Sequence, residues 1–100
     1  MSKNKNVSKA EIYKTSIGKI LILNFKLTIK ANIPAKSQII SNIHSNVPAI
    51  NNMSSTFLRT NDFTSTIFHI DTYPEDGVSL VNVTNIIPGE YRGGIVVITK

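Results

Sequence analysis

Cysteine and tryptophan are absent from this chain of 100 residues. Without cysteine it can form neither a disulfide nor a thiolate metal site, and it has no thiol nucleophile. No apolar run approaches the ~18 residues that a membrane-spanning helix needs, so we expect no membrane partner. Residues 1–15 also lack the apolar segment of a cleaved signal peptide.

Acidic residues are scarce in the first third of the chain. Residues 1–36 hold eight Lys and one Glu, a net charge of +7, whereas residues 37–100 hold three cations and five acids, a net charge of −2. A basic segment suits nucleic acid or another anionic polymer. Nucleic-acid sites interleave basic and aromatic residues on one face, but Phe25 and Lys26 fall on opposite faces of a strand. We therefore favour a solvated strand face plus a charged tail, and anionic-polymer binding stays open as an alternative.

Motifs of catalysis and metal binding are missing as well. The chain has no glycine-rich phosphate loop, no nucleophile elbow and no zinc-protease motif. The acids after residue 36 form no catalytic pair. His69 and Asp71 offer two metal ligands, too few for a closed site unless three copies met on an axis. We predict that the protein is not an enzyme and that it uses no metal and no cofactor.

The chain is rich in β-branched residues, with 16 Ile, 7 Val and 9 Thr, which suit strands. The clearest strand is 18–31, because apolar residues occupy every second position from Leu21 to Ile29. The opposite face begins with Ile20 and Ile22 and then becomes polar. That change predicts that one end of the strand is covered on both sides, by a second sheet or by a neighbouring subunit.

The other strand segments alternate with turns, and no segment has a helical pattern. Residues 1–8 are predicted as a flexible basic leader and residues 9–100 as one domain. Asn61 and Asp62 predict a tight hairpin turn because both tolerate left-handed geometry, and Gly93-Gly94 predicts a bulge or close packing. The pattern is typical of a β-sandwich or barrel with seven strands. The predicted strands are 9–15, 18–31, 37–43, 54–60, 63–72, 78–84 and 91–99.

Two segments carry a resemblance to a known family: a strand with the loop that follows it, and the last strand with its preceding loop. Both resemble the C-terminal β-sandwich domains of phage tail and base-plate proteins, above all the receptor-binding and upper base-plate proteins of phages that infect Gram-positive bacteria. The resemblance covers about residues 9–100 and departs from the family pattern after Ile43. The matching residues are Gly18, Leu23, Phe25, Ile33, Pro34, Ala35, Ile87, Gly89, Tyr91 and Gly93.

The resemblance implies an all-β, antiparallel, jelly-roll-like β-sandwich of about seven to eight strands that assembles as a homotrimer. It implies a non-catalytic viral protein of the virion tail, made in the host cytoplasm. Its partners would be copies of itself, other phage tail proteins and a host cell-surface saccharide. A purely structural trimerisation or connector module of the tail is the alternative, and a basic β domain that binds nucleic acid or another anionic polymer is a further one. Ile20 and Ile22 are the candidate subunit interface.

Five residues are candidate carbohydrate-binding residues because of their chemistry and their expected positions in loops or at rims. Aromatic side chains on exposed loops stack on sugar rings, and nearby polar side chains bind the hydroxyl groups. A tyrosine just before a Pro-containing turn is the aromatic candidate, although it could instead pack over the end of a hairpin. The five candidates are Arg59, His69, Asp71, Tyr73 and His44.

Overall fold

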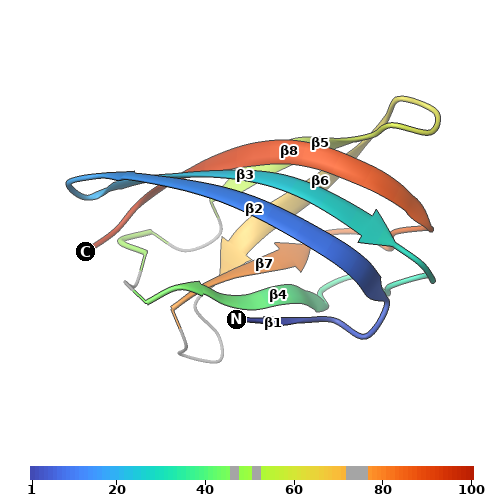
Figure 1. Ribbon diagram of the computed structural model, residues 1–100, viewed down its shortest axis with the longest axis horizontal. Helices are drawn as coiled ribbons and strands as arrows, with labels where there is room; N and C mark the ends of the chain where they lie inside the picture. Colours follow the sequence, from blue (N-terminus) through green and yellow to red (C-terminus); the bar gives the residue numbers. More distant parts are fainter. Residues whose placement is uncertain (46–47, 51–52, 72–76) are drawn as a thin grey trace.

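The computed structural model describes residues 1–45, 48–50, 53–71 and 77–100. All regular structure in these residues is β, and eight strands form one antiparallel sheet in the order β1-β4-β7-β6-β5-β8-β3-β2 (Figure 1). The described residues contain no helix with the length and apolar character needed to cross a membrane. The strands are β1 (Ser2–Lys3), β2 (Val7–Ile17), β3 (Ile20–Ile29), β4 (Gln38–His44), β5 (Ser54–Arg59), β6 (Thr64–Asp71), β7 (Val78–Asn82) and β8 (Gly89–Ile98).

The predicted all-β antiparallel fold is confirmed. Each of the seven predicted strands overlaps one of β2 to β8, and β1 is an addition. The pairs β3–β8, β4–β7 and β5–β6 are nested along the chain, which is the pairing of a long hairpin folded over on itself, as in a jelly roll. Hydrogen bonding continues through one strongly curved sheet, whose two layers face each other in Figure 1.

Strand β3 shows the alternation that the sequence predicts. Its inner side chains, from Leu21 to Ile29 at every second position, are all at least 97% buried. It pairs with β2 on one side and with β8 on the other, and the register with β8 has no irregularity. On the outer face, Ile20 is 41% exposed and Ile22 is half-buried. The described part of this chain therefore leaves both side chains partly exposed.

Four aromatic rings run through the core. Ring centroids are 5.5 Å apart for Phe25 and Phe57, 4.4 Å for Phe57 and Phe68, and 6.2 Å for Phe68 and Tyr91. Gly93 lies against this chain of rings, and a Cβ atom there would lie 2.4 Å from a ring carbon of Phe57. The predicted close packing at the glycine pair is thus confirmed, because only a residue without a side chain lets the Phe57 ring approach β8.

The predicted hairpin around Asn61 and Asp62 is also confirmed, since β5 and β6 pair from Arg59 opposite Thr64 onwards. The predicted left-handed residues are wrong, because the positive φ of this turn, 59°, belongs to Phe63. Asp62 instead accepts hydrogen bonds from the backbone N–H and the hydroxyl of Thr64, at 3.2 and 2.8 Å. The Asp62 carboxylate thus closes the turn by local hydrogen bonds, and Phe63 adopts the strained positive φ.

Residues 2–6 form an N-terminal strap that belongs to the sheet, in contrast to the prediction of a flexible leader. Asn4 donates from its backbone to Ile39 O at 2.8 Å and from its side chain to Gln38 O at 3.1 Å. Asn6 O accepts from Lys30 N at 2.9 Å. The strap therefore joins β4, near one edge of the sheet, to the end of β3, near the other edge. Strand β2 begins at once after it, with a buried Val7.

Asn82 is a fully buried polar residue at the end of β7. Its Nδ2 donates to the carbonyl oxygens of Ile33 at 3.4 Å, Pro34 at 2.8 Å and Thr84 at 2.9 Å, and its Oδ1 accepts from Ser37 N at 2.9 Å. A primary amide supplies both donors and an acceptor, which this site requires. One side chain therefore connects the chain segments that follow β3 and β7.

The substitution Asn82→Asp should lower the free energy of unfolding by roughly 3 kcal/mol at neutral pH, because a carboxylate would face carbonyl oxygens without a donor. Burial would raise the pKa of this carboxyl. The protonated form would then support folding at low pH, and stability would be lost as pH rises through the raised pKa. Urea denaturation from about pH 4 to about pH 8 measures this dependence.

Asn85→Asp is the matched control, because the side chain of the exposed Asn85 bonds within the described residues only through Oδ1, which accepts from Ala35 N at 2.7 Å, and a carboxylate keeps that acceptor. It should change the free energy of unfolding by less than about 0.5 kcal/mol. Equal losses in the two variants, or a pH-independent loss in Asn82→Asp, would contradict the assigned role of Asn82.

Candidate functional site

Three connections meet at one end of the sheet, which we term the loop end: 30–37 between β3 and β4, 83–88 between β7 and β8, and the 60–63 turn. Ile33 and Ile86 exchange two backbone hydrogen bonds, at 3.0 and 2.9 Å, and thereby pair the first two connections. Thr60 N donates to Glu90 O at 2.8 Å and attaches the turn to the start of β8. Backbone pairing therefore holds all three connections in place.

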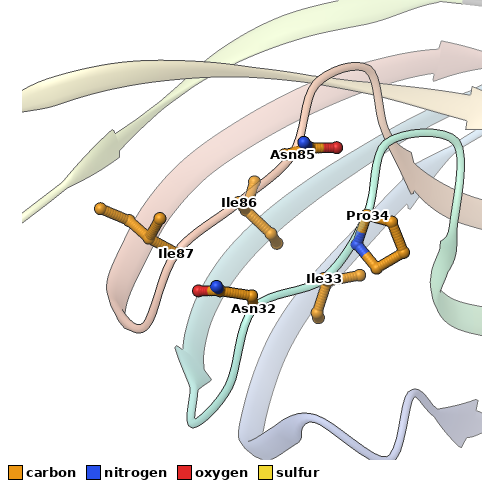
Figure 2. A pocket seen from close by; sticks show the side chains of 6 residues that line it. All are labelled: Asn32, Ile33, Pro34, Asn85, Ile86 and Ile87. Carbon is orange, nitrogen blue, oxygen red and sulfur yellow. The ribbon is translucent and has the colours of Figure 1, made fainter.

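A cavity of about 330 Å³ opens between connections 30–37 and 83–88 (Figure 2). Its lining is apolar except for two asparagines, which Figure 2 shows on opposite sides of Ile86, and no titratable side chain contributes to it. Such a lining suits a neutral ligand that combines an apolar surface with hydroxyl or amide groups. The lining residues are Asn32, Ile33, Pro34, Asn85, Ile86 and Ile87.

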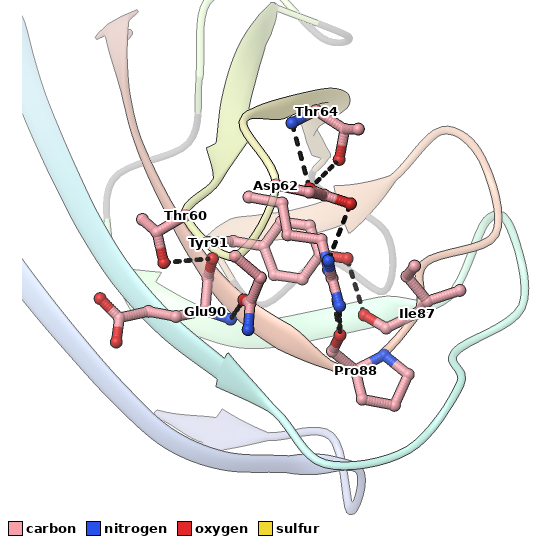
Figure 3. A network of polar contacts seen from close by, with 9 residues as sticks. Thr60, Asp62, Thr64, Ile87, Pro88, Glu90 and Tyr91 are labelled. Atoms are coloured by element: carbon pink, nitrogen blue, oxygen red, sulfur yellow. Dashed lines mark hydrogen bonds and ion pairs between the residues drawn. The ribbon is translucent and has the colours of Figure 1, made fainter.

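A polar network lies beside this cavity (Figure 3). The Arg59 guanidinium donates to Pro88 O from Nε at 3.0 Å and also from Nη2, and its Nη1 pairs with Asp62 Oδ2 at 2.9 Å. The Arg59 side chain is only 16% exposed. Hydrogen bonds from Thr64 lower the pKa of Asp62, with a smaller contribution from Arg59, so Asp62 stays ionised as the partner of Arg59. The hydrogen bonds from Arg59 to Pro88 O therefore fix connection 83–88 to the hairpin, and Asp62 holds the guanidinium in place.

Tyr91 anchors the same connection from inside the core. Its hydroxyl donates to Ile87 O at 2.6 Å, and the residue is 1% exposed. A tyrosine hydroxyl that bonds back to the backbone four residues upstream is the tyrosine corner of Greek-key β proteins. Burial raises the pKa of Tyr91, and the nearby Arg59 cation opposes this effect only in part. The loop end is thus held from both sides, by Tyr91 and by Arg59.

The structure does not gather the five predicted carbohydrate-binding residues into one site. Arg59 lies opposite Thr64 at the turn end of the β5–β6 hairpin, whereas His69 lies opposite Ser54, five positions further along and so roughly 17 Å away. His69 and Asp71 flank the buried Ile70, so both lie on the outer face of β6, while Arg59 follows the inward-facing Phe57 by two positions. Arg59 is therefore separated from the other two.

The remaining two candidates lie elsewhere. His44, half-buried at the end of β4, is opposite Val78, and Asp71 is opposite Ser79, so β7 lies between the two candidates. Gly77 adopts a positive φ, and a Cβ there would collide with His44 O. Tyr73 lies outside the described residues. Among the described residues, no group of three His, Asp or Glu side chains could hold a metal ion.

Phe63 is a further candidate that was not predicted from the sequence. This side chain is 76% exposed at the tip of the hairpin turn, and its φ is positive, which is rare and strained for a bulky residue. Its position directly after an Asn-Asp turn was the available signal, but its apolar character placed it in the following strand. An exposed aromatic ring at the same end of the sheet as a cavity can contact a ligand.

No known family matches the chain, and no curated protein has a significantly similar sequence. The chemistry of the chain's own residues must therefore indicate what the loop end can do. Its polar network serves structure, and its cavity, its asparagine amides and its exposed ring are suited to binding.

The substitution Tyr91→Phe should lower the free energy of unfolding by about 1–2 kcal/mol, because Ile87 O loses its donor inside the protein. It should also reduce the sensitivity to alkali. A raised tyrosine pKa supports folding below the ordinary tyrosine pKa, and this support is lost as pH rises through the raised value. Denaturation at neutral pH and at about pH 10.5 checks both effects.

Tyr13→Phe is the control, since Tyr13 is 63% exposed and its hydroxyl donates to the neighbouring Glu11 side chain on the surface. We expect almost no change in this variant. Matching behaviour of the two variants would show that Tyr91 does not anchor connection 83–88.

Proposed function

We propose that this chain is a non-catalytic structural domain of a phage tail or base plate that works as a homotrimer. The phage assignment comes from the resemblance of its strand and loop segments, and with it come other tail proteins as neighbours and the virion tail as location. The observation that supports assembly is an exposed apolar area on the outer face of β2, β3 and β8. We term it the apolar patch, formed by Ile17, Ile20, Ile22, Val96 and Ile98.

The strand register makes the apolar patch continuous. Ile17 and Ile98 both lie opposite Ile20, and Val96 lies opposite Ile22, so the five side chains form two adjacent rows on one face. Ile17 is 63% exposed and Val96 is 49% exposed. Contiguous aliphatic surface on a small domain typically marks an interaction site. The patch contains both isoleucines predicted as the subunit interface.

Polar residues continue the same face beyond the patch. The next row holds Tyr13 and Asn24, and the row after it holds Glu11, Lys26 and Arg92. An apolar centre next to a polar, mixed-charge border is the usual anatomy of a protein interface. A second copy of this chain offers a matching apolar surface, which supports self-association.

The mass in solution tests this proposal. Light scattering behind a sizing column should report three times 11.0 kDa for the wild type. The double variant Ile20→Thr/Val96→Thr keeps β-branched residues but removes apolar surface, and it should shift the protein to monomer at about 50 μM. A monomeric wild type would contradict the proposal.

Ile67→Thr/Val83→Thr is the matched control for this experiment. It makes the same chemical change at side chains of similar exposure outside the apolar patch, 45% for Ile67 of β6 and 40% for Val83 in connection 83–88. The control should remain trimeric. If both double variants dissociated to the same degree, the apolar patch would not be the interface.

A second function, binding of a host cell-surface saccharide, is favoured by the loop end. Its cavity presents two amides beside apolar side chains, and the exposed Phe63 ring offers a stacking surface at the same end of the sheet. These are the two kinds of contact that neutral sugars use. The constellation replaces the predicted grouping of Arg59 with His69 and Asp71.

The substitution Phe63→Asn tests the saccharide function without unfolding the protein. Asn tolerates a positive φ, so the free energy of unfolding should stay equal or rise by about 1 kcal/mol. Binding on a glycan array should fall by at least about tenfold if the ring stacks on sugar. Tyr13→Thr, which removes another exposed aromatic side chain, should leave glycan binding unchanged. Wild-type levels of binding in Phe63→Asn would contradict the role of Phe63, and a wild type that binds no glycan would contradict the saccharide function.

A further inference from the structure

We propose that four lysines at the loop end form a binding site for a phosphodiester-linked polymer. The site does not depend on self-association and lies at the opposite end of β3 from the apolar patch. Its members come from two separate parts of the sequence: two are in the N-terminal strap and two follow β3. The four residues, termed the lysine cluster, are Lys3, Lys5, Lys30 and Lys36.

The N-terminal strap brings the lysine cluster together. Lys3 lies opposite Ile40 of β4, and Lys30 N donates to Asn6 O. The strap, which carries Lys3 and Lys5, is therefore attached directly to Lys30. Lys5 lies between Asn4, which is bonded to β4, and Asn6, which is bonded to the end of β3. Figure 1 shows the strap and the connection after β3 at the same end of the molecule. Backbone hydrogen bonds therefore fix the origin of each lysine side chain.

The charges of the lysine cluster are not neutralised in the described part of the chain. All four side chains are exposed, and none forms an ion pair with a described acid. Lys3 Nζ donates to Ser8 O at 3.1 Å, which leaves its charge uncompensated. By contrast, both arginines are paired, Arg59 with Asp62 and Arg92 with Glu90. The loop end therefore holds four lysines whose charges no described acid neutralises.

The neighbouring groups indicate a polymer with neutral units between its charges. Asn6 Nδ2 donates to Asn32 O at 3.1 Å, so the strap touches a residue that lines the cavity. Flexible ammonium groups bind phosphates as point charges. Lysines beside a neutral cavity therefore fit phosphates that alternate with uncharged groups. The cluster itself contains no aromatic residue, so we expect it to bind phosphates without discriminating between bases.

Fluorescence anisotropy with two probes tests this site: a labelled single-stranded oligothymidylate and a labelled poly(glycerol phosphate) of equal phosphate number. We expect both to bind at about 50 mM salt, with an affinity that falls steeply as salt rises. Lys30→Gln/Lys36→Gln should weaken binding about tenfold and reduce the slope of log affinity against log salt by about 1–2.

The matched control is Lys19→Gln/Lys100→Gln, which removes the same net charge from exposed side chains at the opposite end of β3 and β8. It should weaken binding by less than about twofold. Equal losses in the two double variants, or no binding of either probe to the wild type at low salt, would overturn the proposal. Binding of only one probe would support the site and identify the source of its phosphodiesters. The mass of each variant is measured in parallel, so failed assembly and failed binding are distinguished.

Discussion

The uninterrupted register between β3 and β8 is the constraint on which the rest of this structure depends. Side chains alternate between the faces of a strand, so a slip by one residue would exchange the inner and outer sets of both strands. The observed register places the Leu, Phe and Ile side chains of β3 in the core. It also places Ile20 and Ile22 outside beside Ile98 and Val96, and it brings Gly93 opposite Phe25, where the Phe57 ring packs against the glycine. Core and apolar patch are therefore two consequences of one alignment.

At the loop end, polar residues divide into those that maintain structure and those that remain accessible. Asn82, Tyr91 and Arg59 direct their hydrogen bonds at backbone carbonyl oxygens of the connections, and each is largely withdrawn from solvent. Because these side chains satisfy the carbonyl oxygens, the irregular backbone of the connections can be buried without unpaired polar groups. The groups left for partners are the asparagine amides at the cavity, the Phe63 ring and the lysine cluster. Rigid support beneath accessible side chains is what a binding surface needs.

Prediction from the sequence succeeded where the signal was local and periodic. Alternation in 18–31 and the Asn-Asp turn identified β3 and the β5–β6 hairpin, and they did so because strand period and turn chemistry act over a few residues. Prediction failed for the N-terminal strap, whose polar composition resembles that of a solvated tail. Its order arises from hydrogen bonds to residues more than 20 positions away, such as that from Lys30 to Asn6 O. Arg59 was chosen for its chemistry as a ligand contact, yet its partner Pro88 O is a backbone atom that no side-chain pattern could reveal.

The amino-acid sequence by itself determined the all-β class, the positions of seven strands and the inward face of β3, because apolar spacing and turn residues specify these locally. Only the tertiary structure decided which strands pair, that two connections enclose a cavity, and that lysines from the strap and from the end of β3 lie together. Those features depend on contacts between residues distant in sequence. The physical reason is that the hydrophobic effect selects which face is buried but is non-directional, while the register and the backbone hydrogen bonds of the curved sheet select the neighbours.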